Sequence, residues 1–293
     1  MPTVRRRKVF AFLFRVGTFL ALALVLAPAG WVLAGVVAKA APDWQWSVLW
    51  TAQGTGGFTG GLEGPLVGTL VLMAGVLVIA GTVGVLAGVH LAELARPRPG
   101  AGGPSTWLRM ASDVLSGFPS IVLGYVGYVA LVVGLHWGYS LLPAVLILSV
   151  MVVPYIAKST ESALRQVPTS YREGAEALGM STGYALRKVV LKSGAPGIVT
   201  GILIALAIAG GETAPLLYTA NFSSSLWTGS LTGGHEFGYL TYMVYTFWDE
   251  PNTHAIALSY DAALILVALV LVLLVSARIV VARTQRHTEG RQR

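Results

Sequence analysis

The chain has 293 residues, of which 55% are hydrophobic and only 11% are charged, and its mean hydropathy is +0.69. Soluble domains carry about 25% charged residues, so the composition excludes an ordinary soluble globular protein. The absence of cysteine excludes disulfides and thiolate metal sites. The histidines are scattered and never at ligand spacing, so we expect no metal ion or other cofactor.

Six apolar runs are long enough, or nearly so, for the about 20 residues that a helix needs to cross the hydrocarbon. They are 16–38, 66–91, 117–136, 140–157, 197–219 and 257–281. The fourth run is the shortest and ends at Pro154. The runs predict an all-α, polytopic membrane protein with six transmembrane helices. We expect a cytoplasmic N-terminal segment (1–15), a transmembrane domain (16–285) and a cytoplasmic tail (286–293).

Basic residues indicate the orientation. With the N-terminus in the cytoplasm, the segments 1–15, 92–116, 158–196 and 282–293 lie inside. Of the 20 Lys and Arg, Lys39 is then the only one outside, which is the positive-inside pattern. Both termini are therefore expected in the cytoplasm. The net charge of +7 is explained by basic residues facing anionic membrane lipid, and it requires no nucleic-acid partner.

Two segments admit other interpretations. The basic N-terminus, its apolar run and Ala38-Lys39-Ala40 resemble a signal peptide, but the run exceeds the 7–15 apolar residues of an ordinary signal peptide, which favours an uncleaved span. The glycine-rich stretch Gly54–Gly68 suggests nucleotide binding, yet it follows no strand and the chain contains no Gly-Lys-Ser/Thr. The chain thus lacks a P-loop and is not expected to be an enzyme; any ATP hydrolysis belongs to another polypeptide.

The inside loop 158–196 contains the signals of a short polar helix. Pro168 suits a first helical turn, good helix formers follow from Tyr171 to Leu178, and Gly179 suits the left-handed position just past a helix end. Ser181 and Thr182 can cap the next helix. The alternative is an ordinary solvated surface helix, which composition alone does not reject.

This stretch resembles the EAA loop, E-A-A-x3-G-x9-I-x-L-P, of the membrane subunits of ABC importers. Glu173, Gly174, Ala175 and Gly179 match its first part, and Val189, Leu191 and Lys192 match its last part. Gly, Val and Lys replace the Ala, Ile and Pro of that pattern. The resemblance implies a coupling helix that docks on an ATPase, with Glu173 and Gly179 anchoring and turning it.

A second stretch, GGETAPLLYTA from Gly210 to Ala220, is similar to a segment of phosphate-uptake permeases, as are Ser116–Gly127 and the sequence around Gly60–Gly68. The resemblance covers roughly residues 55–285 and is nearest to the A-type permease subunit. It implies the type I importer fold and four kinds of partner besides membrane lipid: a second permease subunit, two cytoplasmic ATPases, an extracytoplasmic phosphate-binding protein, and phosphate itself.

Glu212 lies within a predicted span, where an ionisable group is costly and usually functional. With Thr213 and Pro215, which breaks the helix ladder, it marks a gate or pathway element. Because a carboxylate repels phosphate, Glu212 is not expected to contact the substrate unless it is protonated. The alternative is a polar tie between helices.

Candidate pathway cations follow the fourth span. Lys158 and Glu161 are i,i+3 neighbours and Arg165 follows one turn later. Phosphate permeases carry a basic residue and a Glu at this spacing, and a further basic residue where this chain has Ile208. The alternative for Lys158 and Arg165 is positive-inside anchoring.

The outer loop 220–256 is rich in aromatic residues and contains no Lys or Arg. It is interpreted as a docking surface for a binding protein, or as an interfacial aromatic belt.

The sequence thus predicts a permease subunit of an ATP-driven phosphate importer in the cell membrane. The alternatives are a permease for another oxyanion or small solute and an ion-coupled secondary transporter. Such transporters often contain internal repeats, and no clear repeat is evident here.

Overall fold

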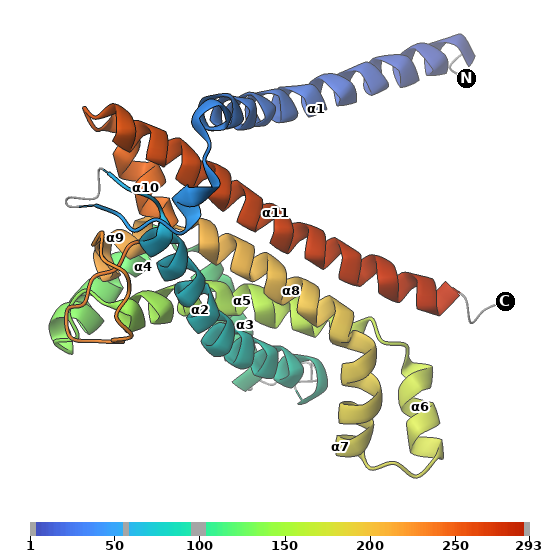
Figure 1. Cartoon of the computed structure of the whole chain (residues 1–293). Coiled ribbons are helices and arrows are strands. Elements are labelled where there is room, and N and C mark those ends of the chain that lie inside the picture. The colour runs from blue at the N-terminus through green and yellow to red at the C-terminus, as the bar shows by residue number, and fades with distance from the viewer. Residues whose placement is uncertain (1–3, 55–58, 95–103, 290–293) are drawn as a thin grey trace. The chain divides into compact units, whose positions relative to one another are not determined.

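The computed structural model describes residues 4–54, 59–94 and 104–289 (Figure 1). These residues form helices and loops, with one isolated bridge between Gln53 and Gly60 and no strand. The first three and last four residues of the expected cytoplasmic ends lie outside the described residues. The chain divides into two units, Met1–Gln45 and Trp46–Arg293, which are described separately.

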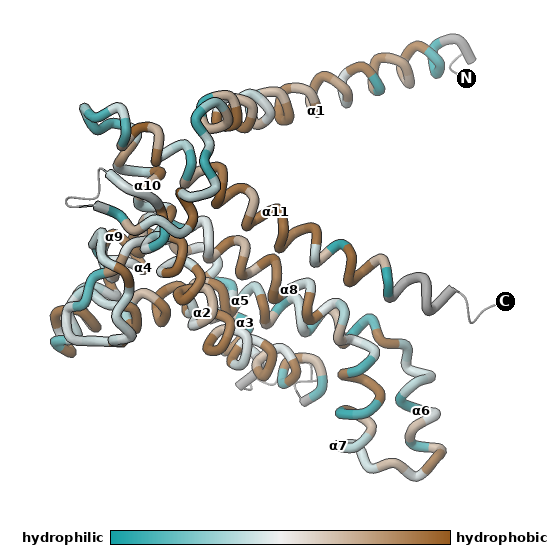
Figure 2. Tube along the Cα trace, in the orientation of Figure 1, coloured by the Kyte–Doolittle hydropathy of each residue, from teal (hydrophilic) through white to brown (hydrophobic). Residues whose placement is uncertain are grey.

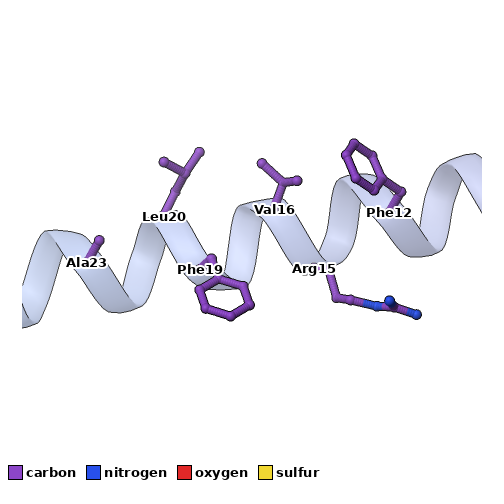
Figure 3. Close-up of a pocket in the computed structure, with 6 residues that line it drawn as sticks. All are labelled: Phe12, Arg15, Val16, Phe19, Leu20 and Ala23. Atoms are coloured by element: carbon purple, nitrogen blue, oxygen red, sulfur yellow. The ribbon is translucent and has the colours of Figure 1, made fainter.

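The first unit consists of helix α1 (Val4–Ala40) and a short 3-10 turn, η1 (Ala41–Asp43). Its most apolar window has no buried residue within the structure. Figure 3 shows a hollow along α1 that is lined only by side chains of that helix: Phe12, Arg15, Val16, Phe19, Leu20 and Ala23. It is therefore a groove on one helix rather than an enclosed pocket. Such an apolar surface fits a helix surrounded by lipid or by another membrane subunit.

The second unit is built around α5 (Leu141–Arg165), which packs against α2 (Glu63–Val89) and α8 (Leu191–Gly211). In α5, 67% of the most apolar window is buried, against 33% in α2. Glycines allow this close approach: a Cβ on Gly88 of α2 would meet the carbonyl oxygen of Ala157 at 2.6 Å, and one on Gly197 of α8 would meet the Ala163 Cβ at 2.6 Å. Small residues that let backbones come together are typical of helix pairs in membranes.

Helix α5 extends further than its sequence suggests. It passes through Pro154 without ending and continues to Arg165, so the fourth apolar run is the first part of a longer helix. The opening residues of the expected inside loop 158–196 are therefore helical. The helix tolerates Pro154 because neighbouring helices can compensate for the lost backbone hydrogen bond.

The third apolar run is not a simple span. The run itself, 117–136, forms α4 (Ser120–Gly127) and the π-helix η5 (Tyr128–Gly134). Helix α3 (Pro104–Gly117) precedes it, almost wholly within the expected inside segment 92–116, and the two parts are bent by 103°. The bend occurs at Phe118-Pro119, where Pro119 is extended at ψ 131 and begins α4. A residue that precedes proline is driven out of the helical region, which explains the break.

The segment after α8 is compact. It contains α9 (Ala214–Thr219), α10 (Leu240–Thr246) and the 3-10 turn η7 (Phe247–Asp249), and it leads into α11 (Thr253–Glu289). Many of its aromatic residues are packed inside rather than displayed: Phe237, Tyr239 and Phe247 are no more than 3% exposed. Phe222 stacks on Tyr242 with a centroid distance of 4.2 Å. The interpretation as belt or docking residues is therefore wrong for Phe237, Tyr239 and Phe247, whereas Tyr245 and Trp248 are exposed.

Five helices of the described chain are long and apolar enough to cross a membrane, or up to six if the bent pair counts as one span. Figure 2 shows apolar residues along α1, α2, α8 and α11, and hydrophilic residues on α6 (Thr169–Ala177), which a turn joins to α7 (Thr182–Ala185). The protein is thus an all-helical, multi-pass membrane protein with a polar hairpin between α5 and α8.

Candidate functional site

The polar hairpin is formed by α6 and α7, and its turn is specified by backbone geometry. Pro168 precedes α6 at the N-cap position, and Gly179 follows it with a φ of +73. The Gly179 N–H donates to the carbonyl of Glu176 (2.9 Å), and the Met180 N–H donates to that of Ala175 (3.0 Å). These two bonds define a Schellman motif. The predicted short helix and its glycine turn are confirmed, with Ser181 at the N-cap of α7 but without a side-chain capping bond.

One face of α6 is buried against the protein, and most of its other residues are exposed. Ala175 is 4% exposed, whereas Glu173, Gly174 and Glu176 are exposed. At the tip, Leu178 is 77% exposed, a large apolar surface in a polar hairpin. Behind α6, Leu191 packs against a small core of Leu164, Val167, Val190 and Ile198. The hairpin therefore presents a defined, partly apolar surface on a rigid base.

Arg172 attaches α6 to the end of α2, a contact that sequence reasoning missed. Its guanidinium forms a two-pronged ion pair with Glu93 of the π-helix η4 (His90–Leu94), in which Nη2 lies 2.8 Å from Oε1 and Nη1 contacts Oε2. Nη2 also donates to the Leu164 carbonyl at 3.2 Å. The Glu93 hydrogen bonds raise the pKa of Arg172 above its usual value. The partners are separated by 79 positions, so no local pattern in the sequence indicates the pair.

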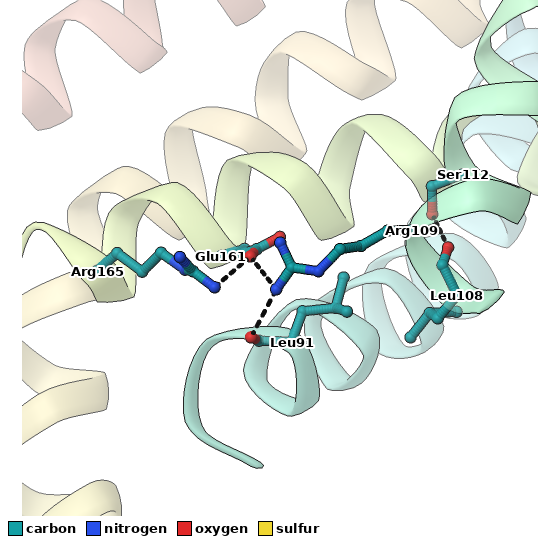
Figure 4. Close-up of polar contacts among 6 residues, drawn as sticks. All are labelled: Leu91, Leu108, Arg109, Ser112, Glu161 and Arg165. Atoms are coloured by element: carbon teal, nitrogen blue, oxygen red, sulfur yellow. Dashed lines mark hydrogen bonds and ion pairs between the residues drawn. The ribbon is translucent and has the colours of Figure 1, made fainter. Parts of the chain in front are cut away.

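Glu161, near the C-terminal end of α5, forms ion pairs with two arginines (Figure 4). Its Oε1 lies 2.8 Å from Nη2 of Arg109 on α3 and 2.9 Å from Nη2 of Arg165 on its own helix. Arg109 Nη2 also donates to the Leu91 carbonyl at 3.3 Å. The Glu161 side chain is only 13% exposed, and burial strengthens such charge-assisted bonds.

Lys158 has an acidic partner as well. Its Nζ lies 2.8 Å from Asp113 Oδ1 and 3.5 Å from the Ser116 hydroxyl. The predicted cluster of Lys158, Glu161 and Arg165 is thus brought together at one end of α5, but each cation is already paired with a carboxylate. In this arrangement the side chains join α3 to α5; a substrate role for any of them stays a prediction.

Glu212, Thr213 and Pro215 lie at a break between two helices. Helix α8 ends at Gly211, Glu212 is extended with ψ 134, and α9 begins at Ala214. The Glu212 carbonyl accepts a hydrogen bond from the Thr241 hydroxyl at 3.0 Å. Within the described part of the chain, no ion pair or hydrogen bond involves the Glu212 carboxylate. The predicted interruption is present, but it falls at Glu212 and Thr213, and Pro215 lies in the first turn of α9.

The break is closely packed against α4. A Cβ on Gly124 of α4 would meet the Pro215 Cα at 2.6 Å. The helix break and the cluster of Lys158, Glu161 and Arg165 lie beside different ends of α8. Gly194, near the start of α8, faces Leu164, which neighbours Arg165 on α5, whereas the break follows Gly211 at the end of α8. At 1.5 Å per residue this separates them by about 25 Å. The sequence-predicted residues thus form two separate groups.

Comparisons with known proteins agree with this architecture. Residues 80–286 match the family of binding-protein-dependent transport system inner membrane components. A phosphate transport system permease protein PstA 2 from Mycobacterium bovis is 54% identical over 276 residues, covering 94% of this chain and 89% of the relative. A phosphate transport system permease protein PstA from Yersinia pestis is 34% identical over 210 residues, covering 70% of this chain and 67% of the relative.

A solved structure of the MetNI methionine ABC transporter in an inward-facing conformation is similar in fold. The TM-score is 0.56 at 24% identity, with 75% of this chain and 94% of that chain covered. The family match, over residues 80–286, includes both the polar hairpin and the helix break. The chain therefore belongs to the binding-protein-dependent transport system inner membrane components, and among these to the PstA permease family.

Proposed function

We propose that this chain is a permease subunit of an ATP-driven phosphate importer. The observation that carries the proposal is the 54% identity to a phosphate transport system permease over 94% of the chain. The partners that follow are a second permease subunit, two cytoplasmic ATPases and an extracytoplasmic phosphate-binding protein. The chain then spans the membrane six times with both termini in the cytoplasm, and ATP is hydrolysed on the separate ATPase subunits.

In this proposal α6 is the coupling helix. Its exposed Glu173, its open Gly174 and the apolar tip at Leu178 form the surface that an ATPase groove receives, while Ala175 and Leu191 fix the helix to its base. Gly179 turns the chain back into α7. A short helix capped by a Schellman turn has a fixed length and direction, so it can transmit displacement rather than absorb it.

The helix break is proposed to border the translocation path. Residues Glu212 and Thr213 are not helical, and non-helical backbone at membrane depth is tolerated where it is packed or lines a cavity. Lys158, Glu161 and Arg165 then lie near the inner end of the path. Their mutual pairing favours a structural contribution over direct phosphate binding, which leaves phosphate to backbone groups or to the second permease subunit.

The test is uptake of labelled phosphate into vesicles that contain the complete complex, with Glu173→Arg compared with Glu176→Arg. Both changes reverse an exposed charge on α6, but only Glu173 matches the coupling motif. We expect Glu173→Arg to abolish both ATPase co-purification and uptake, and Glu176→Arg to retain at least half of each. Normal assembly and uptake in Glu173→Arg would remove the coupling role from α6.

The same vesicles separate the alternatives. ATP-dependent uptake that persists with an uncoupler supports the importer and contradicts an ion-coupled secondary transporter. Uptake of labelled sulfate without uptake of phosphate would keep the importer and overturn the substrate.

A further inference from the structure

Two arginines from different helices bind the end of α2. In η4, the Glu93 carboxylate is bound by Arg172 of α6, and the Leu91 carbonyl is bound by Arg109 of α3. Each arginine has a second acceptor on α5: Arg172 donates to the Leu164 carbonyl, and Arg109 pairs with Glu161. Four elements are thus connected at one point by two side chains.

These contacts differ from ordinary surface ion pairs. Exposed pairs contribute little because water screens them and the side chains lose freedom. Here the carboxylates are mostly covered, with Glu93 14% and Glu161 13% exposed. Both arginines are planar donors that satisfy two acceptors at once, which fixes direction as well as distance. Positive side chains also suit the carbonyl end of α2.

Helix α6 depends on Arg172 for this attachment. Ala175 is its one buried residue in the described structure, and its remaining side chains are exposed or partly exposed. Arg172 connects it to both α2 and α5. A displacement of α6 therefore acts through this one side chain on both the end of α2 and α5.

A continuous route leads on from that point. Arg109 holds the end of α2 to α3, and α3 turns by 103° into α4. Gly124 of α4 lies against Pro215 of α9, directly after the Glu212–Thr213 break. Packed helices transmit such displacements because their contacts leave no space to absorb them.

We propose that Arg172 and Arg109 are positioning residues that hold α6, the end of α2, and α3 as one body, so that movement of α6 reaches the helix break. The inference rests on the proposed function and adds to it the two side chains through which an ATPase-driven displacement enters the membrane domain. Neither arginine contacts phosphate; each acts through the helices that it holds.

The experiment uses the complete complex in proteoliposomes and measures inorganic phosphate transported per ATP hydrolysed. Arg172→Met and Glu93→Gln each remove the ion pair, and Arg187→Met removes an exposed charge from the neighbouring η6 (Leu186–Val190). We expect the ratio to fall by about twofold to thirtyfold in the first two, the range for side chains along a coupling route. The ratio should be unchanged in Arg187→Met, with ATPase co-purification normal in all three.

Exchanging the charges of Arg172 and Glu93 tests whether the ion pair itself is required. The double variant Arg172→Glu with Glu93→Arg should recover at least half of the wild-type ratio, whereas either single reversal should not. Arg109→Met should also lower the ratio, and adding it to Arg172→Met should cost less than the product of the two separate effects, since both act on the same end of α2.

A covalent replacement of the ion pair tests the same contact without any charge. The chain contains no cysteine, so Glu93→Cys with Arg172→Cys provides the only two thiols in this subunit, and a short bismaleimide can join them. The ratio should be low before cross-linking and should recover after it. A wild-type ratio in Arg172→Met and Glu93→Gln, or no recovery on cross-linking, would overturn the inference and leave the proposed function standing. Absence of phosphate uptake by the wild type would instead overturn the proposed function.

Discussion

Gly174 and Gly179 lie in the same hairpin, and a Cβ on either would meet no atom within 4 Å. They differ in backbone conformation, because only Gly179 has a positive φ, of +73. An L-residue pays about 1 kcal/mol or more to adopt that conformation. In the interior of a helix, by contrast, glycine is less stable than alanine by about 0.5–1 kcal/mol.

Gly179→Ala is therefore expected to weaken the Schellman turn, whereas Gly174→Ala is expected to stabilise α6. Amide hydrogen exchange in the peptide that contains Gly179 and Met180 measures the turn directly, since both N–H groups donate to α6 carbonyls. Exchange should accelerate by about fivefold in Gly179→Ala, corresponding to about 1 kcal/mol. It should not accelerate in Gly174→Ala. Gly179→Asn should lie between them, because asparagine tolerates this conformation better than alanine.

At the level of single residues, the sequence predicted those features that depend on adjacent residues in the chain, such as helix ends. Pro168 and Gly179 mark the ends of α6, and they do so through local backbone preferences. It did not predict the Arg172–Glu93 pair, since long-range contacts depend on how helices pack. Phe237 and Tyr239 were misassigned to the surface for the same reason: an aromatic residue at a membrane interface and one in a core look alike in sequence.

Among the helices, the α2–α5 contact carries a sharp steric requirement. A Cβ on Gly88 would overlap with the Thr160 side chain and lie 2.6 Å from the Ala157 carbonyl oxygen, whereas one on Gly81 would meet only Leu77 Cδ1, at 3.5 Å. Gly88→Ala must separate the helices, and overpacking of this kind costs about 1–3 kcal/mol. Gly81→Ala should cost nothing. The two variants are compared by the temperature at which half of the monodisperse protein is lost on heating in detergent. Equal midpoint temperatures for Gly88→Ala and Gly81→Ala would contradict the close packing.

The helices themselves were predicted from apolar length, and so was the break near Pro215, but the bend at Pro119 was not. Apolar composition identified the runs that became α2, α5, α8 and α11. It could not distinguish Pro119, where the chain bends by 103°, from Pro154, which α5 passes through. Proline removes one backbone hydrogen bond in both cases. Whether the helix continues depends on the neighbours that pack around it, which the sequence pattern does not show.

For the whole molecule, the orientation in the membrane is open to a direct test. The chain has no cysteine, so a single introduced thiol reports on one position. We expect Trp248→Cys, on an exposed residue of η7, to react with a membrane-impermeant maleimide in intact cells. Leu178→Cys, at the exposed tip of the hairpin, should react only after the cells are opened. The reverse pattern would place α6 outside and make its contact with a cytoplasmic ATPase impossible.

The burial of α5 has a consequence for biosynthesis. This helix is covered by α8, whose last residue is made 46 positions after Arg165. At about 5–20 residues per second, the ribosome takes roughly 2–9 seconds to complete that cover. During this interval α5 enters the bilayer without the partner of Ser159, whose hydroxyl donates to the Gly197 carbonyl of α8 at 3.5 Å in the finished protein. The insertion machinery must shelter this span until its neighbour arrives, so the time when the nascent subunit is most easily lost to membrane proteases falls in the middle of its synthesis.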